Sequence, residues 1–260
     1  MSEARILIVV ATLGQRIDFL RQTLESIRSQ SLPSDVVIVA PSGIDAVAAL
    51  AQEFGTGLVP DPGSLTSAIN LGMASIEPRH DYVNWLNDDD LLEPGSLALT
   101  VSALDGRPDA VVAFGACRYI DPEGRALWVS KAGPWAPRIL AWGPDLIPQP
   151  GMLVRTSAWH AVGGLDESFR FAFDLDLLLR LKRIGAFVDV GQVVSSFRWH
   201  PDSLTVGDRT TSLEESERAR RRSLSPAARR CAWMWERPVR AATRMAAAEV
   251  QRRAVRLSAR

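Results

Sequence analysis

YVNWLNDDD, residues 82–90, joins a predicted strand directly to three consecutive aspartates. The first five residues read as a buried strand, so the carboxylates of Asp88, Asp89 and Asp90 emerge at its C-terminal end. Open α/β sheets bind ligands at that edge. Adjacent carboxylates repel one another, and a divalent cation turns that repulsion into attraction. A solvated acidic turn is the alternative explanation for this stretch.

Predicted strands and helices alternate on both sides of this segment. We expect strands at Ile6–Ala11, Val36–Ala40, Gly57–Val59, Asp81–Leu86 and Ala110–Ala116, and helices at Asp18–Gln30, Ala46–Phe54, Thr66–Ile76 and Pro94–Leu104. Such alternation predicts an α/β fold with a mostly parallel central sheet that is flanked by helices.

The second part of the chain has a different pattern. Residues 121–150 are rich in Pro, Gly and Trp, which predicts an irregular region. A helix is expected to begin at Asp174, because acids open this segment and bases close it. Further elements are expected at Gly151–Arg155, Ser157–Val162, Phe187–Val190 and Val193–Phe197, the second a helix and the others strands.

The composition is that of an ordinary globular protein. The 260 residues, 47% hydrophobic and 23% charged, permit one large α/β domain with an appendage. Cys117 and Cys231 give neither a disulfide framework nor a metal-ligand spacing, and they fit a reducing compartment. We therefore expect a cytoplasmic location.

The net charge of zero conceals two oppositely charged parts. Residues 1–217 carry a net charge of −11, and residues 218–260 carry +11, all of the positive charge being arginine. Arginine interleaved with Trp233 and Trp235 suits an anionic membrane surface. A solvated helix that folds back on the acidic body explains the same pattern equally well. Nucleic-acid binding ranks third, because no base-reading module accompanies the charge.

Several common site motifs are absent from the sequence. The first strand is not followed by Gly-x-Gly-x-x-Gly, and there is neither a Walker-type lysine nor a Gly-x-Ser-x-Gly elbow. This argues against a dinucleotide fold, a P-loop enzyme and a serine hydrolase. The polar candidates that stand out are Asp174, as helix cap or general base, Arg198, as phosphate contact, and His200, as metal ligand or surface histidine.

Together the motifs resemble those of family 2 of the inverting glycosyltransferases, which have the GT-A fold. The resemblance runs from about Ile6 to Thr205. Four short stretches carry it in the expected order: Ala11–Arg16, like the opening nucleotide-binding loop; Ser67–Met73, like the helix before the acidic motif; Trp85–Asp90, like the DxD segment; and Gly163–Glu167 with Phe173–Leu177, like the Gly-Gly-Phe-Asp-Glu and Glu-Asp-x-Asp-Leu stretch.

The resemblance implies a domain plan and a set of site residues. A GT-A catalytic domain is expected over residues 1–215, with a nucleotide-sugar-binding half (1–117), an acceptor-binding half (118–215) and then an Arg-rich helical tail (216–260). Asp174 is the expected catalytic base. Mn²⁺ or Mg²⁺ is expected on the metal ligands Asp88, Asp90 and His200. Donor contacts are expected from Thr12, Leu13, Arg16, Ser42, Asn70, Asn87, Asp88, Asp89 and Arg198.

The implied activity is inverting transfer of a sugar from a nucleoside-diphosphate sugar, with UDP- and dTDP-sugars favoured. The acceptor would be a saccharide or a lipid-linked hydroxyl, in cell-surface polysaccharide or glycolipid synthesis. Lipid-linked acceptors favour contact of residues 216–260 with an anionic membrane, at the inner face of the cell membrane. No nucleic-acid partner is expected.

Two alternatives to this activity stay open. Ile69 and Phe173 depart from the family pattern, which leaves room for a catalytically silent sugar-nucleotide-binding protein. A nucleotidyltransferase would also use paired carboxylates with a divalent metal.

Overall fold

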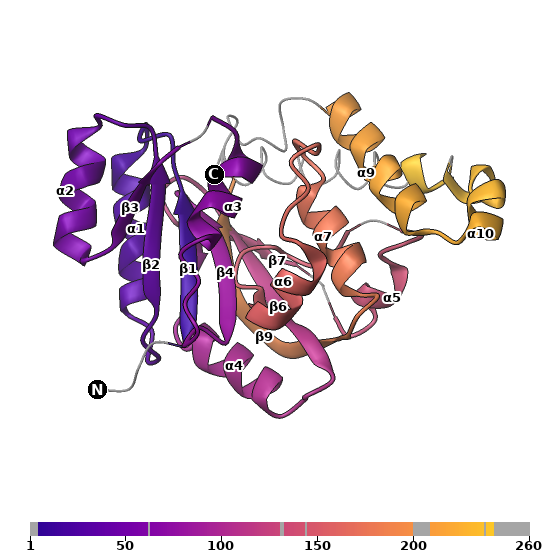
Figure 1. The fold of residues 1–260 in the computed structure, drawn as a ribbon, viewed down its shortest axis with the longest axis horizontal. Helices are drawn as coiled ribbons and strands as arrows, with labels where there is room; N and C mark the ends of the chain where they lie inside the picture. Colours follow the sequence, from indigo (N-terminus) through magenta and orange to yellow (C-terminus); the bar gives the residue numbers. More distant parts are fainter. Residues whose placement is uncertain are drawn as a thin grey trace.

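The computed structural model describes residues 5–61, 63–130, 133–143, 145–199, 209–236 and 238–241. Strands and helices alternate through most of this length (Figure 1). The strands are β1 (Ile6–Ala11), β2 (Asp35–Ala40), β3 (Gly57–Pro60), β4 (Tyr82–Asn87), β5 (Leu91–Leu92), β6 (Ala110–Ile120), β7 (Ala126–Val129), β8 (Leu153–Arg155) and β9 (Ala186–Arg198). The helices are α1 (Ile17–Arg28), α2 (Asp45–Phe54), α3 (Leu65–Met73), α4 (Ser96–Asp105), α5 (Ala136–Ile139), α6 (Thr156–Val162), α7 (Phe173–Leu181), α9 (Arg209–Ser223) and α10 (Pro226–Cys231).

One sheet joins the strands in the order β3-β2-β1-β4-β8-β6-β9-β5, with β7 paired to β6. The pairs β2–β3, β1–β2, β1–β4 and β6–β9 are parallel. The short strands β5, β7 and β8 pair antiparallel with their neighbours. The predicted α/β fold with a mostly parallel sheet is confirmed.

Two hydrophobic cores lie on the two faces of this sheet. Side chains alternate between the faces along a strand, so Leu7 and Val9 of β1 pack on one face and Ile6 and Ile8 on the other. The first core also contains buried residues of α3, α6 and α7. The second contains those of α1, α2 and α4. Helices α3 and α7, which carry predicted site residues, therefore share one face of the sheet.

The region after β4 differs from the prediction in two places. The two strands predicted at 187–190 and 193–197 are one continuous strand, β9. Gly191 lies between them with φ +68°, and the β6–β9 register shifts near it, so an irregularity in a single strand imitates a turn in sequence. The region 121–150, predicted to be irregular, contains β7 and the single helical turn α5.

The described part of the basic tail is helical and lies against the body. Helix α9 runs beside α7 (Figure 1), and Ala219 of α9 belongs to the first core. The predicted boundary between residues 215 and 216 falls inside α9. For the described residues 216–236 and 238–241 this arrangement favours the folded-back helix over a free membrane-binding tail. Residues 242–260 lie outside the described residues.

Among the described residues, no helix combines the length and the apolar character that a membrane-spanning segment requires.

Candidate functional site

The first loop and the acidic segment meet at one edge of the sheet. Strands β1 and β4 are parallel neighbours, with Ala11 opposite Asn87, so the residues that follow both strands lie at the same edge. The Thr12 hydroxyl donates a hydrogen bond to Asp88 Oδ2 and accepts one from the Gly14 amide at 2.9 Å. This contact fixes the first loop to the first carboxylate of the triplet.

Arg16 bridges two of the three aspartates. Its Nη2 donates to Asp88 Oδ1 and its Nη1 to Asp89 Oδ2, both at 2.7 Å. The Arg16 side chain is 37% exposed, whereas those of Asp88 and Asp89 are 4% and 10% exposed. The guanidinium thus covers the two carboxylates and compensates their charge from the solvent side.

Asp90 is the most deeply placed member of the triplet. Asn87 Nδ2 donates to Asp90 Oδ2 at 3.0 Å, and the other oxygen, Oδ1, is buried without a hydrogen-bond partner among the described atoms. Burial, reinforced by the charge of Asp89, raises the pKa of Asp90 well above its ordinary value. Burial also raises the pKa of Asp88, against the opposing effects of Thr12 and Arg16.

Two further predicted donor contacts lie on the surface of the same edge. Leu13, next to Thr12, is 59% exposed. Ser42 is exposed in the turn that follows β2, the other parallel neighbour of β1. The loops after β1, β2 and β4 therefore bring most of the predicted donor residues to one edge of the sheet, as expected for parallel strands.

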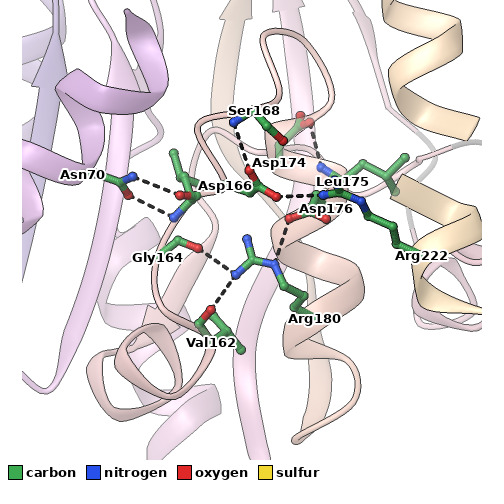
Figure 2. Close-up of polar contacts among 11 residues, drawn as sticks. Asn70, Val162, Gly164, Asp166, Ser168, Asp174, Leu175, Asp176, Arg180 and Arg222 are labelled. Atoms are coloured by element: carbon green, nitrogen blue, oxygen red, sulfur yellow. Dashed lines mark hydrogen bonds and ion pairs between the residues drawn. The ribbon is translucent and has the colours of Figure 1, made fainter. Parts of the chain in front are cut away.

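Asn70 of α3, predicted to contact the donor, holds a loop from the second half of the chain. Its Nδ2 donates to the Leu165 carbonyl at 3.0 Å, and its Oδ1 accepts from the Leu165 amide at 2.9 Å (Figure 2). A third bond runs from Asn70 Nδ2 to Glu167 Oε1 at 3.0 Å. Gly164 permits this contact, because a Cβ there would lie 2.9 Å from Asn70 Oδ1 and its φ is +70°.

Asp174 lies in the first turn of α7, on a partly buried surface. Its Oδ1 accepts from the Leu175 amide at 2.7 Å (Figure 2). Burial raises the pKa of Asp174 to about 6, against the hydrogen bond that stabilises its ionised form. A carboxyl that titrates near 6 has the proton affinity expected of a general base working close to neutral pH.

The next acid in the same helix has a structural role. Asp176 Oδ2 accepts from Arg180 Nε at 2.8 Å, and Arg180 Nη1 donates to the carbonyls of Val162 and Gly164 at 2.7 and 2.8 Å (Figure 2). Helix α7 is thereby tied to the same loop that Asn70 holds from the other side.

Two charged residues near Asp174 were missed by the sequence analysis. Burial and the charge of Asp174 raise the pKa of Asp145 to about 7, and Arg220 of α9 acts against this rise. Burial lowers the pKa of Arg220. No signal in the sequence identifies either residue, because Asp145 sits in the irregular region and Arg220 is one of many arginines in the tail.

The predicted residues from the end of β9 are only partly described. Arg198 is buried, and its guanidinium donates to Gln22 Oε1 at 2.7 Å and to the carbonyls of Pro122 at 2.8 Å and Asp89 at 3.3 Å. In this position Arg198 supports the acidic loop through the Asp89 carbonyl. Its contact with phosphate stays a prediction. His200 lies outside the described residues. Within the described ranges, no cluster of three or more His, Cys, Asp or Glu side chains is arranged to hold a metal by itself.

The chain is similar in sequence to a known protein family and to known proteins. The family model described as glycosyl transferase family 2 matches residues 7–157. An uncharacterized glycosyltransferase of Rickettsia typhi is 21% identical over 77% of this chain and 65% of its own length. The O-antigen biosynthesis protein RfbC of Myxococcus xanthus is 28% identical over 63% of this chain and 12% of its own length. The chain thus covers less than two thirds of the length of these relatives.

Solved structures with the same fold are more distant in sequence. S. aureus TarS residues 1–349, in complex with UDP, gives a TM-score of 0.61 at 14% identity, over 86% of this chain and 68% of that one. The mannosyltransferase PcManGT from Pyrobaculum calidifontis, in complex with GDP-Man and Mn²⁺, gives 0.57 at 15% identity, over 78% of this chain and 59% of that one. These similarities extend over most of this chain and show that the fold is shared.

Proposed function

The chain belongs to glycosyltransferase family 2, and from that premise we propose that it transfers a sugar from a nucleoside-diphosphate sugar to a hydroxyl acceptor with inversion at the anomeric carbon. A single displacement of this kind needs no protein nucleophile. It needs one group that removes the acceptor proton and a set of groups that bind the leaving diphosphate.

The observation that carries this proposal is the state of Asp174. Burial raises the pKa of its carboxyl to about 6. Asp174 lies in the first turn of α7, and the bonds of Arg180 and Asn70 to the loop at residues 164–165 connect this helix to the donor side of the molecule. We assign Asp174 as the base that accepts the proton of the acceptor hydroxyl during attack. General-base assistance of this kind contributes roughly 10²- to 10⁴-fold.

The loops after β1, β2 and β4 are the proposed donor-binding groups. Arg16 has the half-exposed guanidinium there, and it already binds two carboxylates, so an incoming diphosphate offers it further oxygen acceptors of the same charge. Thr12, Leu13, Ser42 and Asn87 complete this surface in our proposal. The UDP in the TarS complex and the GDP-Man in the PcManGT complex support a nucleotide-linked donor.

The acidic triplet has oxygen atoms that fit a divalent cation. Asp90 Oδ1 is buried without a partner among the described atoms, and carboxylate oxygens are the ligands that Mg²⁺ and Mn²⁺ prefer. We propose that Asp88 and Asp90 would hold the ion, with His200 as a further candidate. Such an ion, when bound, neutralises charge on a leaving diphosphate. The Mn²⁺ of the PcManGT complex supports this assignment.

The acceptor is proposed only as a class. The name of the M. xanthus relative, an O-antigen biosynthesis protein, supports a saccharide or lipid-linked acceptor in cell-surface polysaccharide synthesis. Contact of residues 216–260 with an anionic membrane at the site of that synthesis stays a prediction from their sequence.

A two-stage experiment tests the function. Thermal unfolding is first measured with UDP-, dTDP- and GDP-sugars, each with and without Mn²⁺, because a ligand of the folded state raises Tm with its concentration. The donor that stabilises the protein is then offered with a panel of saccharide and lipid-linked acceptors. We expect metal-dependent stabilisation by one nucleotide class, followed by transfer with inverted anomeric configuration.

Other outcomes would overturn the proposal in distinct ways. Stabilisation by a donor without turnover on any acceptor would identify a catalytically silent binding protein. Pyrophosphate release from a nucleoside triphosphate and a sugar 1-phosphate would identify a nucleotidyltransferase. A product that retains the donor's anomeric configuration would remove the role assigned to Asp174.

A further inference from the structure

A carboxylate of helix α9 accepts hydrogen bonds from the backbone just before α7. Glu215 of α9 accepts hydrogen bonds from three consecutive amides, those of Arg170, Phe171 and Ala172. The Phe171 amide lies 2.7 Å from Glu215 Oε2, and the other contacts are 3.0 Å. One carboxylate thus accepts from all three of the backbone amides that directly precede the helix.

The N-terminal end of α7 is a place where the backbone needs a hydrogen-bond acceptor. The first amides of a helix have no partner within the helix, and negative charge near them is favoured by the helix dipole. Ala172 precedes the first residue of α7 and has no side chain able to cap it, and the structure gives this helix no side-chain cap of its own. Glu215 supplies an acceptor for one of these amides, that of the N-cap residue Ala172, from 43 residues further along the chain.

The protonation state of Glu215 suits this task. Burial alone would raise the pKa of Glu215, but the amides of Arg170, Phe171 and Ala172 outweigh burial and lower it. The side chain is therefore a carboxylate at neutral pH, with the charge that strengthens bonds from backbone amides.

Neighbouring residues of α9 hold the preceding part of the same loop. Arg218 Nη2 donates to the Ser168 carbonyl at 2.7 Å, and its guanidinium lies 4.1 Å from the centre of the Phe169 ring. Arg222 Nη1 donates to Asp166 Oδ2 at 2.8 Å (Figure 2). Side chains of α9 therefore contact several of the residues 166–172. The contacts of Glu215 are the ones closest in sequence to Asp174.

We propose that Glu215 is a positioning residue for sugar transfer: by fixing the amides of residues 170–172, it sets the first turn of α7 and, through it, the direction of the Asp174 carboxylate. Asp174 is the second residue of α7, so a change in the entry of the helix moves it directly. This inference rests on the proposed function of Asp174 as base. It places part of the catalytic machinery beyond residue 157, where the family match ends.

The test compares Glu215→Ala and Glu215→Gln with Glu214→Ala. Glu214 is the exposed neighbour on the same helix and gives a control of equal charge change. We expect Glu215→Ala to lower kcat roughly 10- to 100-fold, the size of effect expected from a displaced catalytic group, with the donor KM within about 2-fold of wild type. Glu215→Gln keeps one acceptor oxygen without the charge, so its kcat should lie between that of Glu215→Ala and that of wild type. The kcat of Glu214→Ala should match wild type.

Two readouts separate positioning from plain loss of stability. Amide hydrogen exchange of residues 170–176 should accelerate in Glu215→Ala, while exchange in β1 and β4 should not change. Added acetate, a carboxylate small enough for the space left by the side chain, should restore part of kcat in Glu215→Ala and none in Glu214→Ala.

The outcomes distinguish this inference from the function on which it rests. A Glu215→Ala protein that keeps wild-type kcat, or whose residues 170–176 exchange no faster, overturns the positioning role. The same holds if kcat falls only in proportion to the unfolded fraction. If wild-type protein transfers no sugar at all, the proposed function fails, and the exchange measurement still decides whether Glu215 fixes the entry of α7.

Discussion

Asn70 and Leu165 exchange a pair of hydrogen bonds across 95 residues of sequence, at 3.0 and 2.9 Å. The side-chain amide of Asn70 satisfies both backbone groups of Leu165, as a neighbouring strand would. The pair joins helix α3, on the predicted donor side, to the loop that precedes the helix of Asp174.

Replacing Asn70 with Ala should destabilise the protein and impair transfer. Leu165 would lose both partners, and each buried hydrogen bond contributes about 1 kcal/mol, so we expect a loss of about 2–3 kcal/mol in the free energy of unfolding. Urea denaturation measures it. Ser67→Ala is the control, because it removes only exposed side-chain bonds, the one to Glu167 and the one accepted from the Ser64 hydroxyl. Equal losses in the two variants would contradict the role of Asn70 as a clamp.

Asp174→Asn should separate chemistry from binding. The amide has nearly the same shape and still accepts from the Leu175 amide, but it cannot take the acceptor proton. We expect kcat to fall roughly 10²- to 10⁴-fold while the donor dissociation constant stays within about 2-fold. Steady-state kinetics and calorimetric titration measure the two quantities. Glu25→Gln, an exposed change in α1, is the control and should behave as wild type.

The activity should fall on the acid side of neutrality. Because burial raises the pKa of Asp174 to about 6, the base is ionised above that pH and protonated below it. We expect kcat to decline about tenfold per unit below about pH 6 and to level off above it. Donor binding measured over the same range serves as the control for unfolding. A kcat that stays constant from pH 5 to 8 would argue against a base with this pKa.

Asp145→Asn should stabilise the protein at alkaline pH. A carboxyl whose pKa is raised in the folded state binds its proton more tightly there than when unfolded, so its ionisation destabilises the fold as pH rises from about 4 to about 7. Asparagine carries no such cost. The gain at pH 8 should be about 1–3 kcal/mol, since one pKa unit corresponds to about 1.36 kcal/mol and solvent screens part of the full effect at a partly exposed residue.

This gain has a clear pH signature. Below about pH 4 both forms of residue 145 are neutral, so the unfolding free energies of the variant and of wild type should converge. Urea midpoints at pH 4 and pH 8 measure the difference, with Glu25→Gln again as the control. A gain of the same size at both pH values would point to packing instead of charge.

Arg16→Ala should weaken donor binding, and it should also destabilise the fold, because two nearly buried carboxylates lose their compensating charge. The guanidinium is half-exposed, but it is the group that faces solvent over Asp88 and Asp89. Loss of charge-assisted bonds to a diphosphate costs about 1.5–3 kcal/mol, so the donor KM should rise roughly 10- to 100-fold. Arg16→Lys should recover only part of it, because an ammonium cannot bridge two carboxylates with a planar fork. An unchanged KM would remove Arg16 from the donor site.

The sequence was most informative where local pattern and sheet topology act together. The apolar runs of β1 and β4 predicted their burial, and parallel pairing then places Thr12 beside Asp88. The boundary near residue 191 was wrong because a glycine with positive φ interrupts a strand in the same way that it ends one. The family resemblance added Asn70, and for Asp174 it favoured the role of catalytic base over that of helix cap.

The remaining contacts could not be read from sequence. Asp145, Glu215 and Arg220 are ordinary charged residues in their own segments, and their importance comes from packing against α7. Charge counting gave the tail a net positive value and drew attention to its arginines. The residue that binds the backbone ahead of Asp174 is instead an acid, Glu215, which stands just before the tail as charge counting divides the chain. Only the path of α9 across the body reveals it.

The path of α9 also orders events during synthesis of the chain. Strands β1 to β4 leave the ribosome before α9 does, and domains generally begin to fold from their N-terminal side. Glu215 is translated 41 residues after Asp174, so the entry of α7 lacks its anion until α9 has been made. Under the proposed function, a nascent chain in which the sheet is already formed would bind donor while still unable to use it, and activity would begin only after α9 has been added.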